Sequence, residues 1–292
     1  MKNTIIYYYD IKVEDYRKSE KKFVFFDSRE NIEYEFTEFY GNIKEMLDIY
    51  MLLRYNNKTN YEIILNKNNE VITFFENKPY ILLKNKNHEI KKEIELNDLL
   101  NKENVINSNT KINWKKLWED KNDYYENYLD NVKIKYPIIK ESLSYYIGMS
   151  ELAINLLSYV NYNDIDYVIS HKRINKISDL YNPTNLLIDS RTRDIAEFIK
   201  LKYINDELNQ EKIFDFIKFN YFSKDECILL LARLIYPTYY FDLCEKVCFY
   251  NEKEDKLNKI IKKNVHYESF LKVIYNILKN KQNIMVIDFL EN

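Results

Sequence analysis

The segment from His171 to Asp189 carries the residues whose types and spacing could do chemistry. Asp179 and Asn185 lie in its polar loop, and residues 193–199 after it have the pattern of a helix. A strand, a polar loop, a short apolar strand and a helix could together hold carboxylates and an amide around a metal–phosphate group. Because Asn185 and Asp189 are an even number of residues apart, we expect their side chains on the same side of the strand. The alternative is a hairpin whose polar residues only cap turns.

The scarcity of glycine limits how the chain could hold a nucleotide. The 292 residues include only Gly41 and Gly148. Loops that wrap phosphates need positive φ angles or a backbone without a Cβ atom, and glycine supplies both. Two isolated glycines can form neither a Rossmann fingerprint nor a Walker loop, so both of these routes to nucleotide binding are excluded.

The rest of the composition excludes several other classes of protein. The three cysteines and three histidines lack the spacing of a zinc site, and an odd number of cysteines fits a reducing compartment. Lysine and arginine (44) are interleaved with aspartate and glutamate (46), so no face for nucleic acid is expected. No apolar run approaches the ~20 residues of a membrane span, and a charge at Asp10 follows too early for a signal peptide. We therefore expect a cytoplasmic globular protein.

The first 85 residues predict a sheet with one helix. The expected strands lie at 4–9, 22–26, 32–36, 61–65, 71–75 and 80–83. Alternation of apolar and charged residues at 32–36 is typical of a half-buried strand, and segments 61–65 and 71–75 are expected to pair as a hairpin. Apolar residues spaced by three and four after Gly41 predict a helix of about twelve residues. Strands, one helix and then antiparallel strands indicate an α+β fold rather than repeated βαβ units.

The second half of the chain is expected to be mainly helical, with a small hairpin of strands at 167–170 and 186–188. Ser223 and Glu226 predict a capping box at the start of one helix, and Pro237 ends or kinks that helix. The polar stretch between the halves is expected to be a linker with one short helix at 96–101. We therefore divide the chain into a first lobe (1–85), a linker (86–111) and a helical lobe (112–292).

Several longer motifs accompany this order of elements. They lie at Trp114–Glu126, Tyr145–Ile154, Asn182–Ile199, Leu229–Asp242 and Tyr267–Tyr275. Together with the layout of the elements, they resemble the bilobal protein-kinase-like fold, in the branch of the aminoglycoside and choline phosphotransferases. More narrowly, they resemble the kinase-like spore coat proteins of the YutH/CotS group. The resemblance spans most of residues 110–290 and, more loosely, the first lobe.

The resemblance implies a catalytic loop, which the sequence matches poorly. Active members of the superfamily carry His-x-Asp-x-x-x-x-Asn, in which the Asp orients or deprotonates the acceptor hydroxyl and the Asn binds metal. Counting forward from His171 puts Arg173 at the Asp position, and counting back from Asn185 puts Leu180 there. Asp179 is one residue away and could act as the base only in a bulged loop.

Other positions implied by the resemblance are mixed. Asp189 matches the second metal-binding aspartate best, because residues 193–199 resemble the element that follows it in the family. In the first lobe the strand 22–26 is followed by Asp27, at a position where the resemblance implies a phosphate-binding lysine. Glu45 on the next helix has no obvious lysine to pair with. Loss of base, lysine and phosphate loop together would remove most of the catalysis.

Three hypotheses follow. The preferred one is a catalytically degenerate kinase-like protein with no cofactor, which has a structural or assembly role with protein partners, in the spore coat by resemblance. The second is a small-molecule phosphotransferase that uses ATP and Mg²⁺, with Asp179 as base and Asn185 and Asp189 on the metal. The third is an unrelated regulatory domain with the same α+β layout.

Overall fold

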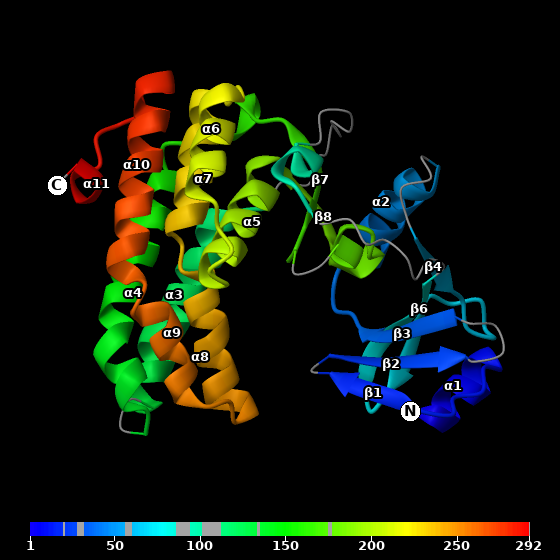
Figure 1. Cartoon of the computed structure of the whole chain (residues 1–292). Coiled ribbons are helices and arrows are strands. Elements are labelled where there is room, and N and C mark those ends of the chain that lie inside the picture. Colours follow the sequence, from blue (N-terminus) through cyan, green and yellow to red (C-terminus); the bar gives the residue numbers. More distant parts are fainter. Residues whose placement is uncertain are drawn as a thin grey trace. The chain divides into compact units, whose positions relative to one another are not determined.

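A computed structural model describes residues 1–19, 21–27, 32–55, 60–85, 94–100, 112–132, 135–174 and 177–291. These residues form two compact units (Figure 1). The first unit consists of Met1–Ile94 and His171–Leu187, and the second of Glu95–Ser170 and Ile188–Asn292. Most of the expected linker, 86–93 and 101–111, lies outside the described residues, and the lobe boundaries stay a prediction.

The first unit is built on an antiparallel sheet of six strands. Its elements are α1 (Lys2–Tyr9), β1 (Tyr16–Ser19), β2 (Lys22–Asp27), β3 (Ile32–Glu38), α2 (Ile43–Tyr55), β4 (Tyr61–Ile64), β5 (Ile72–Phe75) and β6 (Lys78–Asn85). The strand order is β1-β2-β3-β6-β4, and β5 also pairs with β6. Register places Glu35 opposite Val24 on one side and Leu83 on the other, so these three side chains share a face.

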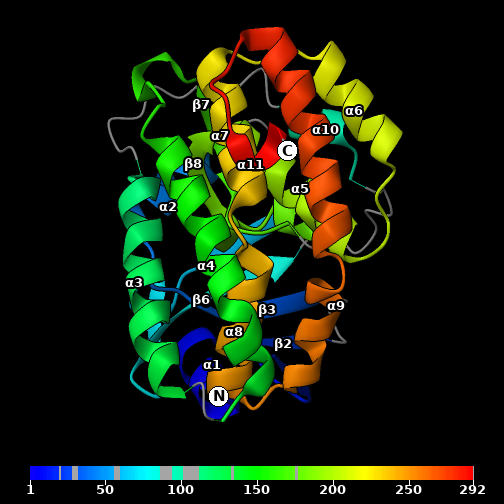
Figure 2. The same cartoon turned by 90° about the vertical axis from the view of Figure 1, so that its left-hand side faces the viewer.

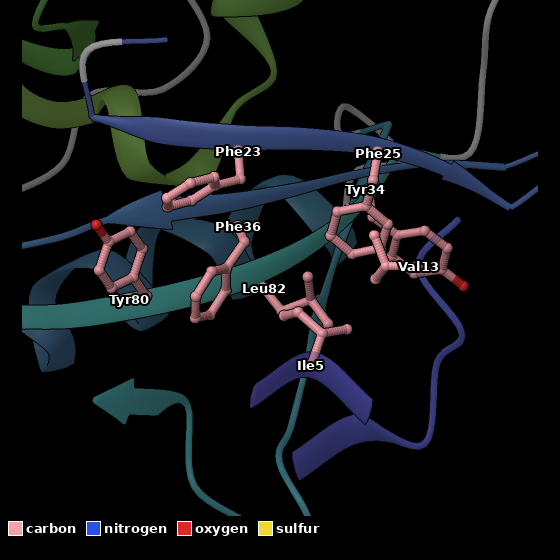
Figure 3. Close-up of a cluster of buried hydrophobic side chains, with 8 residues drawn as sticks. All are labelled: Ile5, Val13, Phe23, Phe25, Tyr34, Phe36, Tyr80 and Leu82. Carbon is pink, nitrogen blue, oxygen red and sulfur yellow. The ribbon is translucent and has the colours of Figure 1, made fainter. Parts of the chain in front are cut away.

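Alternation along the strands gives the sheet two apolar faces. On one face Phe36 stacks on Tyr80 with ring centroids 4.5 Å apart, and Ile5 of α1 covers the aromatic layer (Figure 3). On the other face Met46 of α2 packs on Ile81 and Leu83. The sheet is therefore covered by a helix on each side, which buries both sets of alternating residues.

Two expectations for this unit are wrong. Residues 4–9 form helix α1 rather than a strand, because burying Ile5 against the sheet outweighs the weak strand preference of this aromatic run. Segments 61–65 and 71–75 do not pair with each other; β4 and β5 both pair with β6. The tight hairpin is β5–β6 instead, where Glu76 and Asn77 both have positive φ (50° and 61°), as a type I′ turn requires.

The second unit is mainly helical (Figure 2). Its helices are α3 (Trp114–Val132), α4 (Pro137–Leu157), α5 (Thr192–Ile204), α6 (Gln210–Phe219), α7 (Lys224–Ile235), α8 (Thr238–Tyr250), α9 (Leu257–Ile261), α10 (Asn264–Gln282) and α11 (Asp288–Glu291). Its short 3₁₀ turns are η1 (Leu96–Leu99), η2 (Tyr162–Asp164) and η5 (Glu254–Lys256), whereas η3 (Ile177–Leu180) and η4 (Pro183–Asn185) lie in the segment His171–Leu187 of the first unit. The strands β7 (Tyr167–His171) and β8 (Leu186–Ser190) pair as the expected hairpin.

Helix α7 is the centre of this unit. Every residue from Glu226 to Ile235 is buried, and α7 packs against α4, α5 and α10. The predicted capping box is confirmed, since Ser223 and Glu226 exchange side-chain to backbone hydrogen bonds. The helix ends at Ile235, and Pro237 precedes α8, as expected.

Among the described residues, the stretch Lys224–Tyr250 is long and apolar enough to cross a membrane by length and composition alone. Of its most apolar window, 72% is buried inside the protein, and the stretch is divided into α7 and α8. Core helices of globular proteins have the same properties.

Candidate functional site

The loop between β7 and β8 is fastened by the side chain of Asn185. Its Nδ2 group donates to the backbone carbonyls of Arg173 (2.6 Å) and Asp179 (3.0 Å), and its Oδ1 atom accepts from the Arg173 N–H (3.1 Å). Both amide donors and one acceptor position are thus used by backbone groups. Asn185 works as a clamp that closes the loop.

Asp179 takes part in this clamp through its backbone carbonyl, which accepts from Asn185 Nδ2. The carbonyl of the next residue, Leu180, accepts from His171 Nε2 at 3.1 Å. When the catalytic motif is counted back from Asn185, Leu180 occupies the position of the catalytic base. A leucine side chain can neither accept nor donate a proton.

The same loop belongs to the first unit and packs within it. Tyr181 packs against the cluster that contains Phe39 and Met46, and η4 contacts α2. The ammonium of Lys172 lies 5.1 Å from the centre of the Phe39 ring. Cation–π contacts of this kind stabilise by about 0.5–1 kcal/mol at exposed sites.

Asp189 lies in β8, in the second unit, and is held by two arginines. Arg233 of α7 donates from one nitrogen to both carboxylate oxygens, at 2.9 and 2.8 Å, and Arg193 of α5 contacts Oδ2 at 3.3 Å. The backbone N–H of Ser190 donates to Oδ1 at 2.7 Å. Asp189 is 3% exposed and both arginines are 5% exposed. The carboxylate is therefore neutralised by two guanidinium groups and hydrogen-bonded by them and by a backbone N–H.

Trp114 at the start of α3 covers these arginines. The guanidinium carbons of Arg193 and Arg233 lie 4.4 and 4.9 Å from the centre of one Trp114 ring. The electron-rich face of an indole stabilises two adjacent cations in a dry environment. We name the four side chains the arginine cluster: Trp114, Asp189, Arg193 and Arg233.

Two tyrosines lie within the electrostatic reach of the arginine cluster. Burial raises the pKa of Tyr162 to about 12, against a smaller lowering by the Arg233 charge. Burial also raises the pKa of Tyr167, with Asp189 raising it further and Arg233 lowering it. Both phenols therefore stay protonated at neutral pH, and neither is a general base there.

Sequence reasoning singled out Asp189 but missed its main partner, Arg233, which lies 44 residues later. A signal was present: Arg233 is a lone charge inside the apolar run 228–235. A buried arginine needs an anion, so this run predicts a buried carboxylate elsewhere in the fold.

In the first unit, the strand on which the resemblance implies a phosphate-binding lysine carries a buried glutamate instead. The strand directly before α2 is β3, and Asp27, where the resemblance implies a lysine, is the last residue of β2. In β3 the buried residue on the α2 side of the sheet is Glu35, which is 1% exposed. Lys22 of β2 donates to Glu35 Oε2 at 2.8 Å, and the Tyr61 hydroxyl donates to Oε1 at 3.3 Å. No lysine lies in β3.

Glu45 opens α2, where its backbone N–H is capped by the Asn42 side chain at 3.2 Å. No ion pair joins Glu45 to any residue that the structure describes. The lysine–glutamate pair that positions ATP phosphates in kinases is therefore not assembled from the described residues.

The two side chains expected to bind magnesium and ATP, those of Asp189 and Asn185, do not fit this role. The Asp189 oxygens are occupied by guanidinium and backbone donors, and Asn185 is occupied by loop backbone. Magnesium binding would require at least one arginine to leave a buried carboxylate, and breaking such a pair costs about 3–5 kcal/mol. Within the described part of the chain, no group of three histidine, cysteine, aspartate or glutamate residues could hold a metal ion.

Comparison with known families gives a match over almost the whole chain. A family model described as "Spore coat putative kinase YutH" matches residues 2–274. The Endospore coat-associated protein YutH of Bacillus subtilis (strain 168) is 26% identical over 185 residues. That alignment covers 54% of this chain and 54% of the relative, so it spans about half the length of each.

Solved structures show the fold. An aminoglycoside phosphotransferase from Alicyclobacillus acidocaldarius subsp. acidocaldarius DSM 446 superposes with a TM-score of 0.56 at 10% identity, over 93% of this chain and 94% of that one. The AMP-bound spectinomycin phosphotransferase APH(9)-Ia gives 0.52 at 12% identity, over 96% and 98%. These likenesses confirm the α+β, protein-kinase-like fold expected from the sequence.

Proposed function

Because the chain belongs to the YutH family of kinase-like spore coat proteins, we propose that it has lost phosphotransfer chemistry and serves in assembly of the spore coat. In this proposal it binds neither ATP nor Mg²⁺, is made in the cytoplasm and acts through protein partners. The observation that carries the proposal is the arginine cluster, in which Asp189 is neutralised by protein cations.

The charge balance of the arginine cluster supports loss of metal binding. Two guanidiniums already surround one carboxylate, so a divalent cation would enter a site with a net positive charge. At 5% exposure neither arginine can swing into water without opening the packed layer around α7. The repulsion is stronger there than at the surface, because the effective dielectric constant is lower.

The acidic residue in β3 supports loss of nucleotide binding. Active kinases place a lysine on the third strand to pair with ATP phosphates. Here Glu35 lies on the α2 side of that strand and is itself bound to Lys22 and Tyr61. A carboxylate at this position repels a polyphosphate and uses the nearby ammonium for itself.

The proposed assembly role rests on the similarity of this chain to a spore coat protein. The Bacillus subtilis relative is named as an endospore coat-associated protein. Fluorescent fusion of this chain in its own sporulating host tests the assignment directly. We expect the fusion to accumulate at the forming coat, and a diffuse signal throughout sporulation would contradict it.

Nucleotide binding is tested by thermal unfolding with Mg²⁺–ATP and Mg²⁺–ADP. A ligand at 100 times its Kd stabilises by ~2.7 kcal/mol, which raises the Tm of a chain of this size by roughly 4–5 °C. We expect no saturable rise for either nucleotide, and EDTA alone should leave Tm unchanged. A saturable rise that EDTA removes would overturn the proposal.

One observation favours a second candidate, a small-molecule phosphotransferase. The fold is shared with two aminoglycoside phosphotransferases over more than nine-tenths of the chain. In that function Asp179 would be the base, with Asn185 and Asp189 on Mg²⁺ and ATP as donor. Release of ADP from Mg²⁺–ATP with aminoglycoside acceptors, abolished by Asp179→Asn in a chain of unchanged Tm, would establish it.

A further inference from the structure

The sheet of the first unit ends at β1, which pairs with β2 alone (Figure 1). The hydrogen-bond pattern identifies the backbone groups of β1 that the sheet does not use. The Glu38 N–H donates to the Lys21 carbonyl at 2.8 Å, so every second residue from Lys21 bonds to β3 and the residues between them bond to β1. Arg17 lies opposite one of the latter and bonds to β2. Its neighbours Tyr16 and Lys18 therefore direct their N–H and C=O groups away from the sheet.

The opposite end of the sheet, β4, is closed by a side chain, whereas β1 is open. The Tyr50 hydroxyl of α2 donates to the Tyr61 carbonyl at 3.3 Å and accepts from the Ile63 N–H at 3.4 Å, which occupies outward groups of β4. On the open side of β1, the backbone of Tyr16 and Lys18 has no hydrogen bond to any residue that the structure describes. All four residues of β1 are exposed. The edge can therefore accept one more strand.

The sequence along this edge is complementary to its own reverse. It reads Glu14-Asp15-Tyr16-Arg17-Lys18, with two acids before the tyrosine and two bases after it. When two copies of the edge run antiparallel with Tyr16 opposite Tyr16, each Asp15 lies opposite an Arg17 and each Glu14 opposite a Lys18. The same register brings the outward backbone groups of the two tyrosines together. Charge and backbone therefore select one alignment.

Other alignments of the edge are unfavourable. Placing Tyr16 opposite Lys18 puts Arg17 opposite its own copy, and placing Lys18 opposite itself does the same for two ammonium groups. A shift by a single residue sets outward groups against inward ones, so hydrogen bonds are lost. An extended segment of unrelated sequence would leave these charges without cross-strand partners. The edge therefore favours a second copy of this chain.

The charged side chains of the edge are accessible for such pairing. The Arg17 side chain is 86% exposed and lies 3.8 Å from Glu33, and the Glu14 side chain is 63% exposed and lies 3.8 Å from Lys12. Asp15 is exposed as well. Both existing ion pairs are longer than a hydrogen bond and solvated, so they contribute little and exchange readily for a cross-strand pair.

We propose that β1 pairs with β1 of a second copy about a two-fold axis at Tyr16, which joins the two sheets into one. Each copy supplies the same edge, so the contact is isologous and closes at a dimer. Growth at β4 is blocked by the Tyr50 hydroxyl. A strand pair of this length buries less than the ~800 Å² per partner of a standard stable interface, so the dimer is weak and forms where the protein is concentrated. The inference goes beyond the proposed function and does not depend on nucleotide binding.

Charge reversal at two positions tests the register. Arg17→Asp sets an aspartate opposite Asp15 of the second copy, and Asp15→Arg sets an arginine opposite Arg17. Each variant alone should therefore dimerise more weakly than wild type, by about tenfold or more. Mixed together, the two should form a one-to-one heterodimer, because every acid again faces a base. A chain with both changes should dimerise like wild type. Sedimentation velocity of the full chain, with one variant labelled in the mixture, measures all of these equilibria.

The backbone part of the contact is tested separately. Tyr16→Pro removes an outward N–H without removing a hydrogen bond to β2, since proline is tolerated at such edge positions. Dimerisation should be lost although all the charges remain, whereas Tyr16→Phe, which keeps the N–H and the ring, should dimerise like wild type. In the wild-type chain, the Tyr16 and Lys18 amides should exchange with solvent more slowly as the protein concentration rises.

Matched controls lie on α2 of the same unit. Asp48→Arg and Arg54→Asp reverse charges at exposed positions there, and both should dimerise like wild type. All variants should keep the wild-type Tm, which shows that the sheet is intact. A wild-type chain that stays monomeric at about 1 mM, single reversals or a Tyr16→Pro chain that dimerise normally, or a mixture without heterodimers would each overturn the proposal. None of these results bears on whether ATP binds.

Discussion

Each unit of the protein buries a carboxylate beside cations, but the two arrangements differ in access to water. In the first unit Glu35 contacts one lysine, Lys22, whose side chain remains 28% exposed. In the second unit Asp189 contacts two arginines whose side chains are 5–6% exposed, and an indole face covers them. The first pair keeps contact with solvent, whereas the arginine cluster is sealed.

This difference in exposure determines how much each ion pair contributes to the free energy of unfolding. A half-hydrated pair is screened and contributes little, and removing Glu35 leaves the partly exposed Lys22 able to recover water. A sealed pair is costly to assemble and more costly to break, because the remaining charge stays buried. The chain has only two tryptophans, Trp114 and Trp118, both in the second unit, so tryptophan fluorescence reports on that unit alone.

The largest expected loss of stability comes from breaking the arginine cluster of the second unit. Asp189→Ala leaves Arg193 and Arg233 buried without an anion, so the free energy of unfolding should fall by about 3–5 kcal/mol. Urea unfolding followed by tryptophan fluorescence measures it. A variant with Asp189→Leu, Arg193→Met and Arg233→Met together should recover most of the loss, because buried ion clusters are replaceable by apolar side chains. If Asp189→Ala unfolded at the wild-type urea concentration, the structural role assigned to this carboxylate would be wrong.

The loop clamp ranks second. Asn185→Ala removes three hydrogen bonds to backbone groups, and at about 1 kcal/mol each the loop should lose about 2–3 kcal/mol. Trypsin should then cleave faster at Lys172 and Arg173, while the tryptophan transition stays in place. Asn185→Asp keeps the acceptor but places a carboxylate oxygen against the two carbonyl oxygens, so its cleavage should be at least as fast as that of Asn185→Ala. Equal cleavage of all three chains would show that the clamp is unimportant.

The hydrated pair of the first unit ranks third. Glu35→Gln keeps the shape of the side chain but leaves Lys22 without its ion pair, and a loss of about 1–2 kcal/mol is expected. Amide hydrogen exchange of the β2 and β3 backbone follows the sheet, and Lys22→Met with Glu35→Gln provides the double-mutant comparison. A loss as large as that of Asp189→Ala would erase the contrast between the units.

The smallest loss of stability among these variants is expected at an ion pair on the surface. Glu291 pairs with Lys279 and accepts from the Tyr275 hydroxyl at 2.8 Å, and these two hydrogen bonds hold its pKa below the ordinary value. The folded-state pKa is lowered, so the stabilisation is present above the usual glutamate range and is lost as pH falls through the lower value. Glu291→Gln should loosen α11 slightly at neutral pH, measured by amide hydrogen exchange, and the difference from wild type should vanish in acid. A difference that persisted in acid would exclude the ionised carboxylate as its source.

Local patterns predicted much of the fold. The β3 strand, helix α2, the β7–β8 hairpin and the Ser223–Glu226 capping box follow from alternation, helical spacing and cap chemistry. Helix α1 and the pairing of β4 were missed, because both are decided by contacts with β6 and its neighbours rather than by their own residues.

The candidate site was predictable only in part. The sequence marked Asp179, Asn185 and Asp189 as a group, but it could not show what each side chain binds. Asn185 reaches backbone carbonyls, whose positions depend on the loop, and Asp189 reaches Arg233 across 44 residues. The lone arginine in an apolar helix was the one local sign of that long-range pair.

The position of Arg233 on α7 has a consequence for how the second unit folds. The β7–β8 hairpin and the start of α5 are adjacent in sequence and can form early, but Asp189 stays hydrated until α7 docks. The arginine cluster is therefore expected to close after the rate-limiting barrier. Arg233→Met should then speed unfolding and leave the folding rate nearly unchanged, giving a φ-value near zero. This late closure would make the lifetime of the native state, rather than the speed of reaching it, the property that the cluster sets.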